Sequence, residues 1–223
     1  MLEVLLPNWG RFGNRLINST TATLQMMGIA GGIAFVLGII FGVLLVVTKR
    51  GGILENLWIY NLLDKAINAI RSVPFLILLI LLIPLSRAIA GQATGVPGAI
   101  IPLVFGTTPF FARQIESAIA ELDPGLVEAS LAMGMSPLEI IFSVYLRESI
   151  SSIARVTQIT AINLVALTTF AGAVGAGGLG DFAIQIGQQL RATDMLWAAI
   201  IVILIIVSII QAVGNIVIKL ATK

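Results

Sequence analysis

One glycine arrangement in the sequence is typical of nucleotide binding. Gly175, Gly177 and Gly180 have the G-x-G-x-x-G spacing with which soluble βαβ units bind a pyrophosphate. Here the motif follows a long apolar stretch, and the chain has no G-x-x-x-x-G-K-[ST] motif that would bind ATP. We therefore expect these glycines to allow close helix packing or a non-helical turn, and not to bind a nucleotide.

The side chains that most often perform catalysis or bind metals are missing. The chain has no cysteine and no histidine. This composition excludes Ser-His-Asp and Cys-His catalysis, histidine-ligated metal sites and histidine-based proton relays. We expect no catalytic residues, no metal site and no cofactor bound by this chain.

The composition predicts an all-α integral membrane protein with one transmembrane domain, residues 1–223. Of its residues, 58% are hydrophobic and 11% are charged, whereas about 25% are charged in a typical soluble domain. Such a chain has too little polar surface to cover a soluble fold. Its 13 Lys and Arg residues are scattered along the chain and form no basic patch, so we expect no nucleic-acid partner.

Five stretches are apolar enough to cross a bilayer as helices, a task that takes about 20 residues. They cover about 20–48, 66–86, 98–118, 152–172 and 195–218, with a cytoplasmic loop at about 119–148. Glu3 occupies the place of the basic region of a signal peptide, so we expect no cleavable signal. An outside N-terminus and a cytoplasmic C-terminus place most Lys and Arg residues inside, including Lys223, as the positive-inside rule requires.

The loop between the third and fourth predicted spans carries strong helix boundary signals. Asp123 is a good N-cap and Pro124 suits the first helical position. Gly134 can adopt the left-handed conformation that ends a helix. Ser136 and Glu139 have the spacing of a capping box. We therefore expect a short helix, a glycine turn and a second helix, with one apolar stripe on the short helix that docks on a partner.

The same loop resembles the EAA loop of ABC importer permeases. Glu128-Ala129-Ser130 is followed after three residues by Gly134 and after nine more by Val144-Tyr145-Leu146, close to the family pattern E-A-A, three residues, G, nine residues, I-x-L-P. Ser130, Val144 and Arg147 depart from that pattern, and Arg147 replaces a proline. The stretches RSVPFLILLILLIP, PLVFGTTPFFARQIESA and GAVGAGGLG are similar to segments of methionine importer permeases, the five-span branch of this superfamily.

The resemblance implies a type I ABC importer permease fold, a homodimer in the bacterial inner membrane and import of methionine or a related amino acid. It also implies a pair of separate ATPase subunits that use ATP and Mg²⁺, and a substrate-binding lipoprotein or periplasmic protein. The EAA loop would be the coupling helix that contacts each ATPase subunit, with these residues in the contact: Glu128, Ala129, Ser130, Met133, Gly134 and Ser136. The resemblance aligns Phe170 with an apolar gating position, and the glycines that follow it border the gate.

The fourth predicted span contains polar residues that could face a translocation path. Thr157, Thr160 and Asn163 recur at every third position, and Thr168 and Thr169 follow. In lipid such groups usually face protein or a water-filled path, although each threonine could instead bond to its own helix. We assign Asn163, Thr169, Phe170, Gly172 and Gly175 to the gate or path.

Two further patterns concern packing. Gly38 and Gly42 form a G-x-x-x-G motif, which predicts close helix packing, within one subunit in preference to a dimer contact. Arg113 and Glu116 are three residues apart at the inner end of the third span, which predicts a local ion pair.

Other functions remain open at this point. An importer of the same type for another small solute is one alternative, because an EAA loop reports the ATPase partner and not the cargo. A secondary transporter is another, but such carriers often place carboxylates at the midplane, and here the acidic residues fall in loops or near span ends. A membrane scaffold would leave the EAA spacing unexplained.

Overall fold

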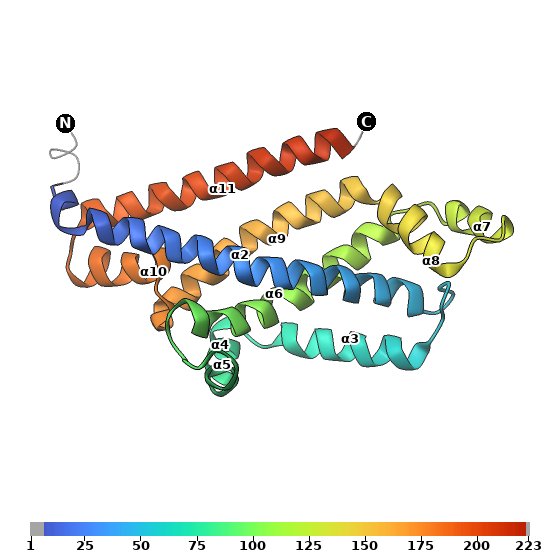
Figure 1. The fold of residues 1–223 in the computed structure, drawn as a ribbon, viewed down its shortest axis with the longest axis horizontal. Helices are drawn as coiled ribbons and strands as arrows, with labels where there is room; N and C mark the ends of the chain where they lie inside the picture. Colours follow the sequence, from blue (N-terminus) through green and yellow to red (C-terminus); the bar gives the residue numbers. More distant parts are fainter. Residues whose placement is uncertain (1–6, 222–223) are drawn as a thin grey trace. The chain divides into compact units, whose positions relative to one another are not determined.

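The computed structural model describes residues 7–221, which include neither Glu3 nor Lys223. Within this range the chain is helical and contains no β-strand, as the composition predicts (Figure 1). The chain folds as two compact units. Residues 7–33, 73–106 and 161–210 belong to the first, and residues 34–72, 107–160 and 211–221 to the second.

Four helical stretches in the described part are long and apolar enough to cross a membrane. They are α2 (Trp9–Thr48), α6 (Gly95–Ala120), the stretch Ile150–Ala176, which joins α9 (Ile150–Ala171) to the π-helix η2 (Gly172–Ala176), and α11 (Thr193–Ala221). These stretches contain the first, third, fourth and fifth predicted spans. The 40 residues of α2 give a length of about 60 Å, roughly twice the thickness of a hydrocarbon core.

The second predicted span, 66–86, is divided among three helices. They are α3 (Leu57–Ser72), α4 (Phe75–Leu81) and α5 (Ile83–Ala90). Pro74, before α4, has an extended conformation with φ −54° and ψ 134°, and Pro84 lies in the first turn of α5. Proline has no backbone N–H and disfavours helical conformation in the residue before it, so the chain breaks at both places. The count of five spans stays a prediction.

The first unit has its core at the start of α2. A buried cluster joins α2 to α9, α10 (Gly178–Phe182), the π-helix η3 (Ala183–Gln189) and α11. Its residues are Phe12, Leu16, Val165, Leu179, Phe182, Ile186, Ala192, Met195, Ala198, Ala199 and Ile206. At its edge, Asn8 donates from its backbone and side-chain amides to the two carboxylate oxygens of Asp194, at 2.9 and 2.8 Å. These bonds hold the start of α2 on the start of α11.

The second unit has its core between α2 and α6. A Cβ added to Gly38 would overlap the side chain of Phe111, and one added to Gly42 would overlap Ile115. Absence of side chains at these two glycines therefore lets α2 approach α6 closely. The G-x-x-x-G motif packs within the chain, as the sequence predicts.

Arg113 joins α6 to α3 in the second unit. Its guanidinium donates to Glu116 at 2.7 Å, which confirms the predicted ion pair. It also donates to the Asp64 carboxylate of α3 and, at 3.1 Å, to Asn68. Asp64 could not be identified from the sequence, because its position relative to Arg113 depends on how the two helices pack.

Candidate functional site

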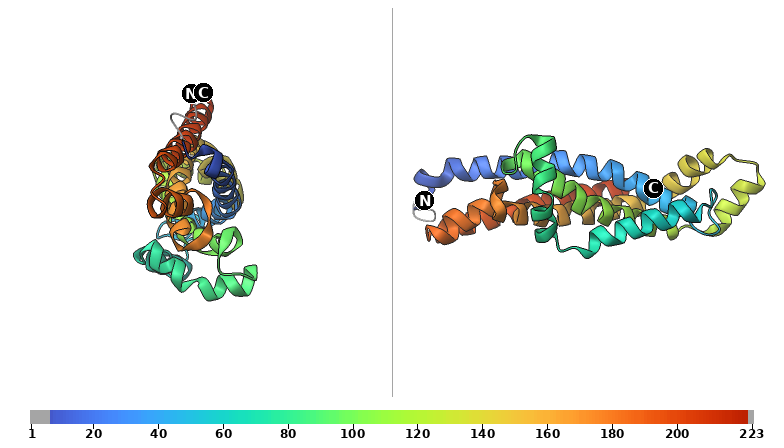
Figure 2. Two further views of the ribbon diagram at one scale, coloured as in Figure 1. Left: turned by 90° about the vertical axis from the view of Figure 1, so that its left-hand side faces the viewer. Right: turned by 90° about the horizontal axis from the view of Figure 1, so that it is seen from below.

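The predicted coupling loop forms two short helices, α7 (Pro124–Ala132) and α8 (Pro137–Ile140), joined by a bend (Figures 1 and 2). Asp123 has an extended backbone, and its carboxylate accepts a bond from the Gly125 N–H at 2.9 Å. Pro124 lies in the first turn. The predicted start of the helix is therefore confirmed, with one otherwise free N–H group satisfied by the cap.

The bend is fixed by a glycine and a capping box. Gly134 has φ +79°, the left-handed conformation that the sequence predicts. The Ser136 N–H donates to Glu139 Oε2 at 2.7 Å, and the Glu139 N–H donates to Ser136 Oγ at 3.4 Å. The backbone bond from Ser136 lowers the pKa of the Glu139 carboxyl below its ordinary value. Both boundary predictions are confirmed.

The chain leaves α8 without the proline of the family pattern. The π-helix η1 (Ile141–Leu146) follows α8 directly, and Arg147 continues in a helical conformation with φ −71° and ψ −47°. Val144 and Tyr145 are buried. The wider π turn thus leads the chain from α8 towards α9 at the place where a proline would interrupt the helix.

The two sides of α7 are both apolar, so the expected single stripe is wrong. Val127 is partly buried and packs against the core of the second unit. Ser130, expected at the partner contact, is only 5% exposed and donates to the Leu126 carbonyl at 2.7 Å. Leu126 and Met133, by contrast, are exposed. A nine-residue helix with few polar residues can pack on its own chain and still present apolar side chains outward.

Four exposed apolar side chains lie along the segment from α7 to η1, and we call them together the outer surface. Its residues are Leu126, Met133, Leu138 and Phe142, with exposed fractions of 44%, 74%, 66% and 65%. Of the predicted contact residues, Glu128, Ala129, Met133, Gly134 and Ser136 are exposed. Several exposed apolar side chains on one short segment favour an interaction site there.

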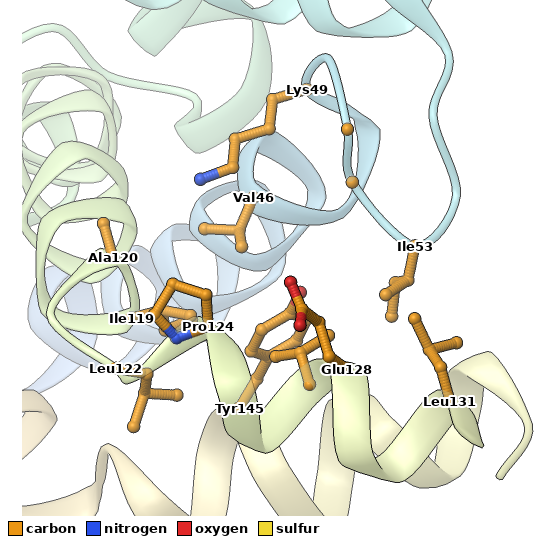
Figure 3. Close-up of a pocket in the computed structure, with 13 residues that line it drawn as sticks. Val46, Lys49, Ile53, Ile119, Ala120, Leu122, Pro124, Glu128, Leu131 and Tyr145 are labelled. Atoms are coloured by element: carbon orange, nitrogen blue, oxygen red, sulfur yellow. The ribbon is translucent and has the colours of Figure 1, made fainter. Parts of the chain in front are cut away.

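A cavity of about 270 Å³ lies on the inner side of α7. Val46 near the end of α2 and Lys49 directly after α2 line it together with Ile53, Glu128 and Tyr145. Figure 3 shows the Lys49 ammonium and the Glu128 carboxylate both pointing into it. The sequence did not indicate Lys49, because nothing local relates it to the EAA loop.

The predicted gate residues lie around the end of α9. Phe170 is 54% exposed, and Thr169 and the buried Thr168 each donate to the Val165 carbonyl. These two threonine hydroxyls therefore bond to their own helix, which is the alternative to a polar path that the sequence analysis left open. Asn163 lies earlier in α9 and is half-buried.

The glycine-rich segment after Phe170 is a tight non-helical turn. Gly175, Gly177 and Gly178 have φ values of +88°, +76° and +80°. A Cβ on Gly172 would meet the Asp181 backbone nitrogen, and one on Gly180 would overlap the Thr169 carbonyl. Both predicted roles, close packing and a turn, are therefore confirmed.

Thr23 of α2 holds this turn in place. It is buried, and its hydroxyl accepts a bond from the Leu179 N–H at 2.9 Å. This bond satisfies a free N–H group in the first turn of α10. Thr23 was not predicted, because its only sequence signal is a hydroxyl in an apolar helix.

Gly180→Ala is expected to destabilise the first unit. The new methyl group would overlap the backbone of Thr169, which cannot move aside as a flexible side chain could. Overpacking of this kind costs roughly 1–3 kcal/mol or more. The thermal midpoint of the purified protein should fall by several degrees. Gly28→Ala is the control, since a Cβ there meets no described atom within 4 Å; an equal loss in both variants would contradict the close-approach account.

Comparison with known proteins places the chain in a family. Residues 34–222 match the sequence pattern of the family described as "Binding-protein-dependent transport system inner membrane component". The chain belongs to this family. As one of these inner membrane components, it spans the membrane with several apolar helices.

Individual members of the family are similar over most of the chain. The "Probable D-methionine transport system permease protein MetI" of Vibrio cholerae is 42% identical over 90% of this chain and 89% of its own. The "Methionine import system permease protein MetP" of Bacillus subtilis is 39% identical over 100% of both chains. A chain of the structure "Inward facing conformations of the MetNI methionine ABC transporter: CY5 SeMet soak crystal form" has a TM-score of 0.91 and 38% identity, with 93% of this chain and 96% of that chain covered.

Proposed function

We propose that the protein is the permease subunit of an ATP-driven ABC importer for methionine or a related amino acid. The observation that carries this proposal is the 39% identity to a methionine import permease over the full length of both chains. The TM-score of 0.91 to a chain of a methionine ABC transporter supports the same fold and role. The chain would form the translocation path, while separate subunits hydrolyse ATP.

The outer surface supports docking of α7 and α8 on an ATPase subunit. Leu126, Met133, Leu138 and Phe142 are exposed on the segment from α7 to η1, in which Asp123 caps the start of α7 and Ser136 caps the start of α8. A helix of fewer than three turns is marginally stable alone, so its caps and a docking partner together define its shape. Movement of an ATPase subunit would then reach the membrane helices through α8, η1 and α9.

The gate is proposed at Phe170. Two such side chains, one from each subunit of a homodimer, would form an apolar constriction that excludes water when the subunits approach. The exposure of Phe170 and the non-helical turn at Gly175 support this proposal. Asn163, Thr169 and Gly172 would border the same path.

A periplasmic protein or lipoprotein would deliver the substrate from outside, and the proposed topology has the N-terminus outside and the C-terminus in the cytoplasm. This topology can be tested with single cysteines, because the native chain has none. We expect cysteines at the exposed positions Gln92 and Gln188 to react with an impermeant external maleimide in intact cells, and one at Glu139 to react only after permeabilisation. External labelling at Glu139 would overturn the orientation and the docking role of the loop.

The cargo can be tested in a methionine auxotroph that lacks its own methionine importers. Expression of this permease with its ATPase and binding protein should restore growth on low concentrations of L- or D-methionine. A permease for another solute would leave methionine uptake at background while a different labelled amino acid entered the cells.

A further inference from the structure

One face of α3 combines a lysine with exposed apolar side chains. Trp58 is 74% exposed and Leu62 56%, and Lys65 and Ala69 are exposed as well. Their spacing of four, three and four residues places all of them on the same side of a helix. We call these four residues the α3 face.

The opposite side of α3 fixes the direction of this face. Ile67 is buried in a cluster with residues of α2 and α6. The carboxylate of Asp64 accepts a bond from the guanidinium of Arg113 in α6. The acidic residue of α3 is therefore directed to its own chain, while Lys65, the next residue, is exposed.

The segment around the α3 face has a basic surface. Residues 49–72 contain two acidic residues, Glu55 and Asp64, and four basic ones. The basic residues are Lys49, Arg50, Lys65 and Arg71. Asp64 is paired with Arg113, and the carboxylate of Glu55 accepts a bond from the Gly51 N–H at 2.8 Å. The charges left at the surface are mainly positive, so this segment attracts anions.

The composition of α3 is that of a helix at the surface of a bilayer. It has 16 residues and is not among the four described stretches that are long and apolar enough to cross a membrane. Basic amphipathic helices with Trp and Leu lie at the boundary between headgroups and acyl chains. Exposed tryptophan is typical of the same boundary, because its ring is apolar and its N–H is polar.

The polar groups of the α3 face can reach one headgroup. Side chains of an α-helix tilt towards its N-terminus, so the stem of Lys65 extends over Leu62 towards Trp58. Lysine places its apolar stem on such a surface and its ammonium at the polar boundary. The ammonium and the indole N–H are both donors. A ligand with a negative phosphate and an acyl chain would match both the donors and the apolar residues, whereas free phosphate would leave Trp58 and Leu62 uncovered.

We propose that the α3 face binds an anionic phospholipid. The ammonium of Lys65 and the indole N–H of Trp58 bind the phosphate, and an acyl chain packs on Leu62 and Ala69. The site is separate from the outer surface and from the gate segment, and it does not depend on the proposed cargo.

Quenching of tryptophan fluorescence by brominated lipids tests this site. Trp9→Phe and Trp197→Phe, both at exposed positions, leave Trp58 as the only tryptophan of the full-length chain. In mixed bilayers we expect brominated phosphatidylglycerol to occupy the site about fivefold better than brominated phosphatidylcholine, as one basic side chain at an anionic surface predicts. Lys65→Gln should abolish the preference, and Lys65→Arg should retain it. Lys219→Gln, which removes an exposed lysine of α11, is the control and should leave the preference unchanged.

Equal quenching by the two lipids when Lys65 is present would overturn the proposal. Lack of quenching by either lipid would also overturn it, and would show that protein, such as a second copy of the chain, covers Trp58. Inorganic phosphate in the buffer should not change the preference; a loss of preference would show that the site takes the free anion and not a lipid.

Native mass spectrometry of the purified complex gives a second measurement. After partial delipidation the wild type should retain phosphatidylglycerol severalfold better than Lys65→Gln. Trp58→Phe keeps an aromatic ring but lacks the indole N–H, so it should also retain less, while Lys219→Gln should behave as the wild type. The assembled fraction of each variant is measured in the same spectra. Wild-type lipid retention by an assembled Lys65→Gln complex would contradict the proposed site.

Discussion

Gly134→Val is expected to abolish substrate-stimulated ATP hydrolysis and uptake, or to prevent assembly of the permease with its ATPase. Gly134 has φ +79°, and a Cβ there meets no described atom within 4 Å. The cost therefore comes from the backbone and not from crowding: a β-branched residue in the left-handed region is strained by on the order of 1–3 kcal/mol. Because α7 is marginal alone, that strain is enough to change the bend before Ser136.

Gly134→Asn is the matched control for this prediction. Asparagine enters the left-handed region more readily than other non-glycine residues, so this variant should assemble and retain most of its activity. ATP hydrolysis and uptake are measured in the same proteoliposomes. Wild-type values for Gly134→Val would show that α7 and its bend do not couple the ATPase to transport.

Phe170→Ala is expected to produce complexes that assemble but leak. If two Phe170 side chains close the path, their truncation opens a wetted gap, and basal ATP hydrolysis or passive substrate flux should rise severalfold over the wild type. The constriction depends on apolar bulk, so Phe170→Leu should keep the path closed. Flux is measured in substrate-loaded proteoliposomes without ATP.

Phe105→Ala provides the comparison for Phe170→Ala, because Phe105 is an exposed phenylalanine of the same unit outside the predicted gate segment. It should lower stability slightly without changing flux. A Phe170→Ala complex that assembles normally, with wild-type flux and basal hydrolysis, would remove Phe170 from the gate.

Local features of the coupling loop could be predicted from the sequence because neighbouring residues determine them. Asp123 caps the helix that starts at the next residue, and Ser136 and Glu139 cap each other across three positions. The left-handed Gly134 was equally predictable, since glycine is the residue that adopts this conformation at low cost. The break of the second predicted span also has a local cause, in Pro74 and Pro84.

Contacts between distant residues could not be predicted in the same way. Asp64 reaches Arg113, Thr23 holds the turn at Leu179, and Lys49 shares a cavity with Glu128 only because separate helices pack together. The two sides of α7 were also indistinguishable in the sequence, since both are apolar. The side of α7 that packs on the rest of the chain is determined by the buried cluster against which Val127 packs.

Transport by the purified complex shows whether the chain is the permease of an ATP-driven methionine importer. The permease, its ATPase and its binding protein are reconstituted into proteoliposomes, and uptake of labelled methionine is followed with ATP and with a non-hydrolysable ATP analogue. We expect methionine to accumulate against its gradient only when ATP is hydrolysed and the binding protein is present, and we expect Gly134→Val to abolish this accumulation. Methionine accumulation driven by an ion gradient without ATP, or no accumulation by a complex that hydrolyses ATP in response to another solute, would contradict it.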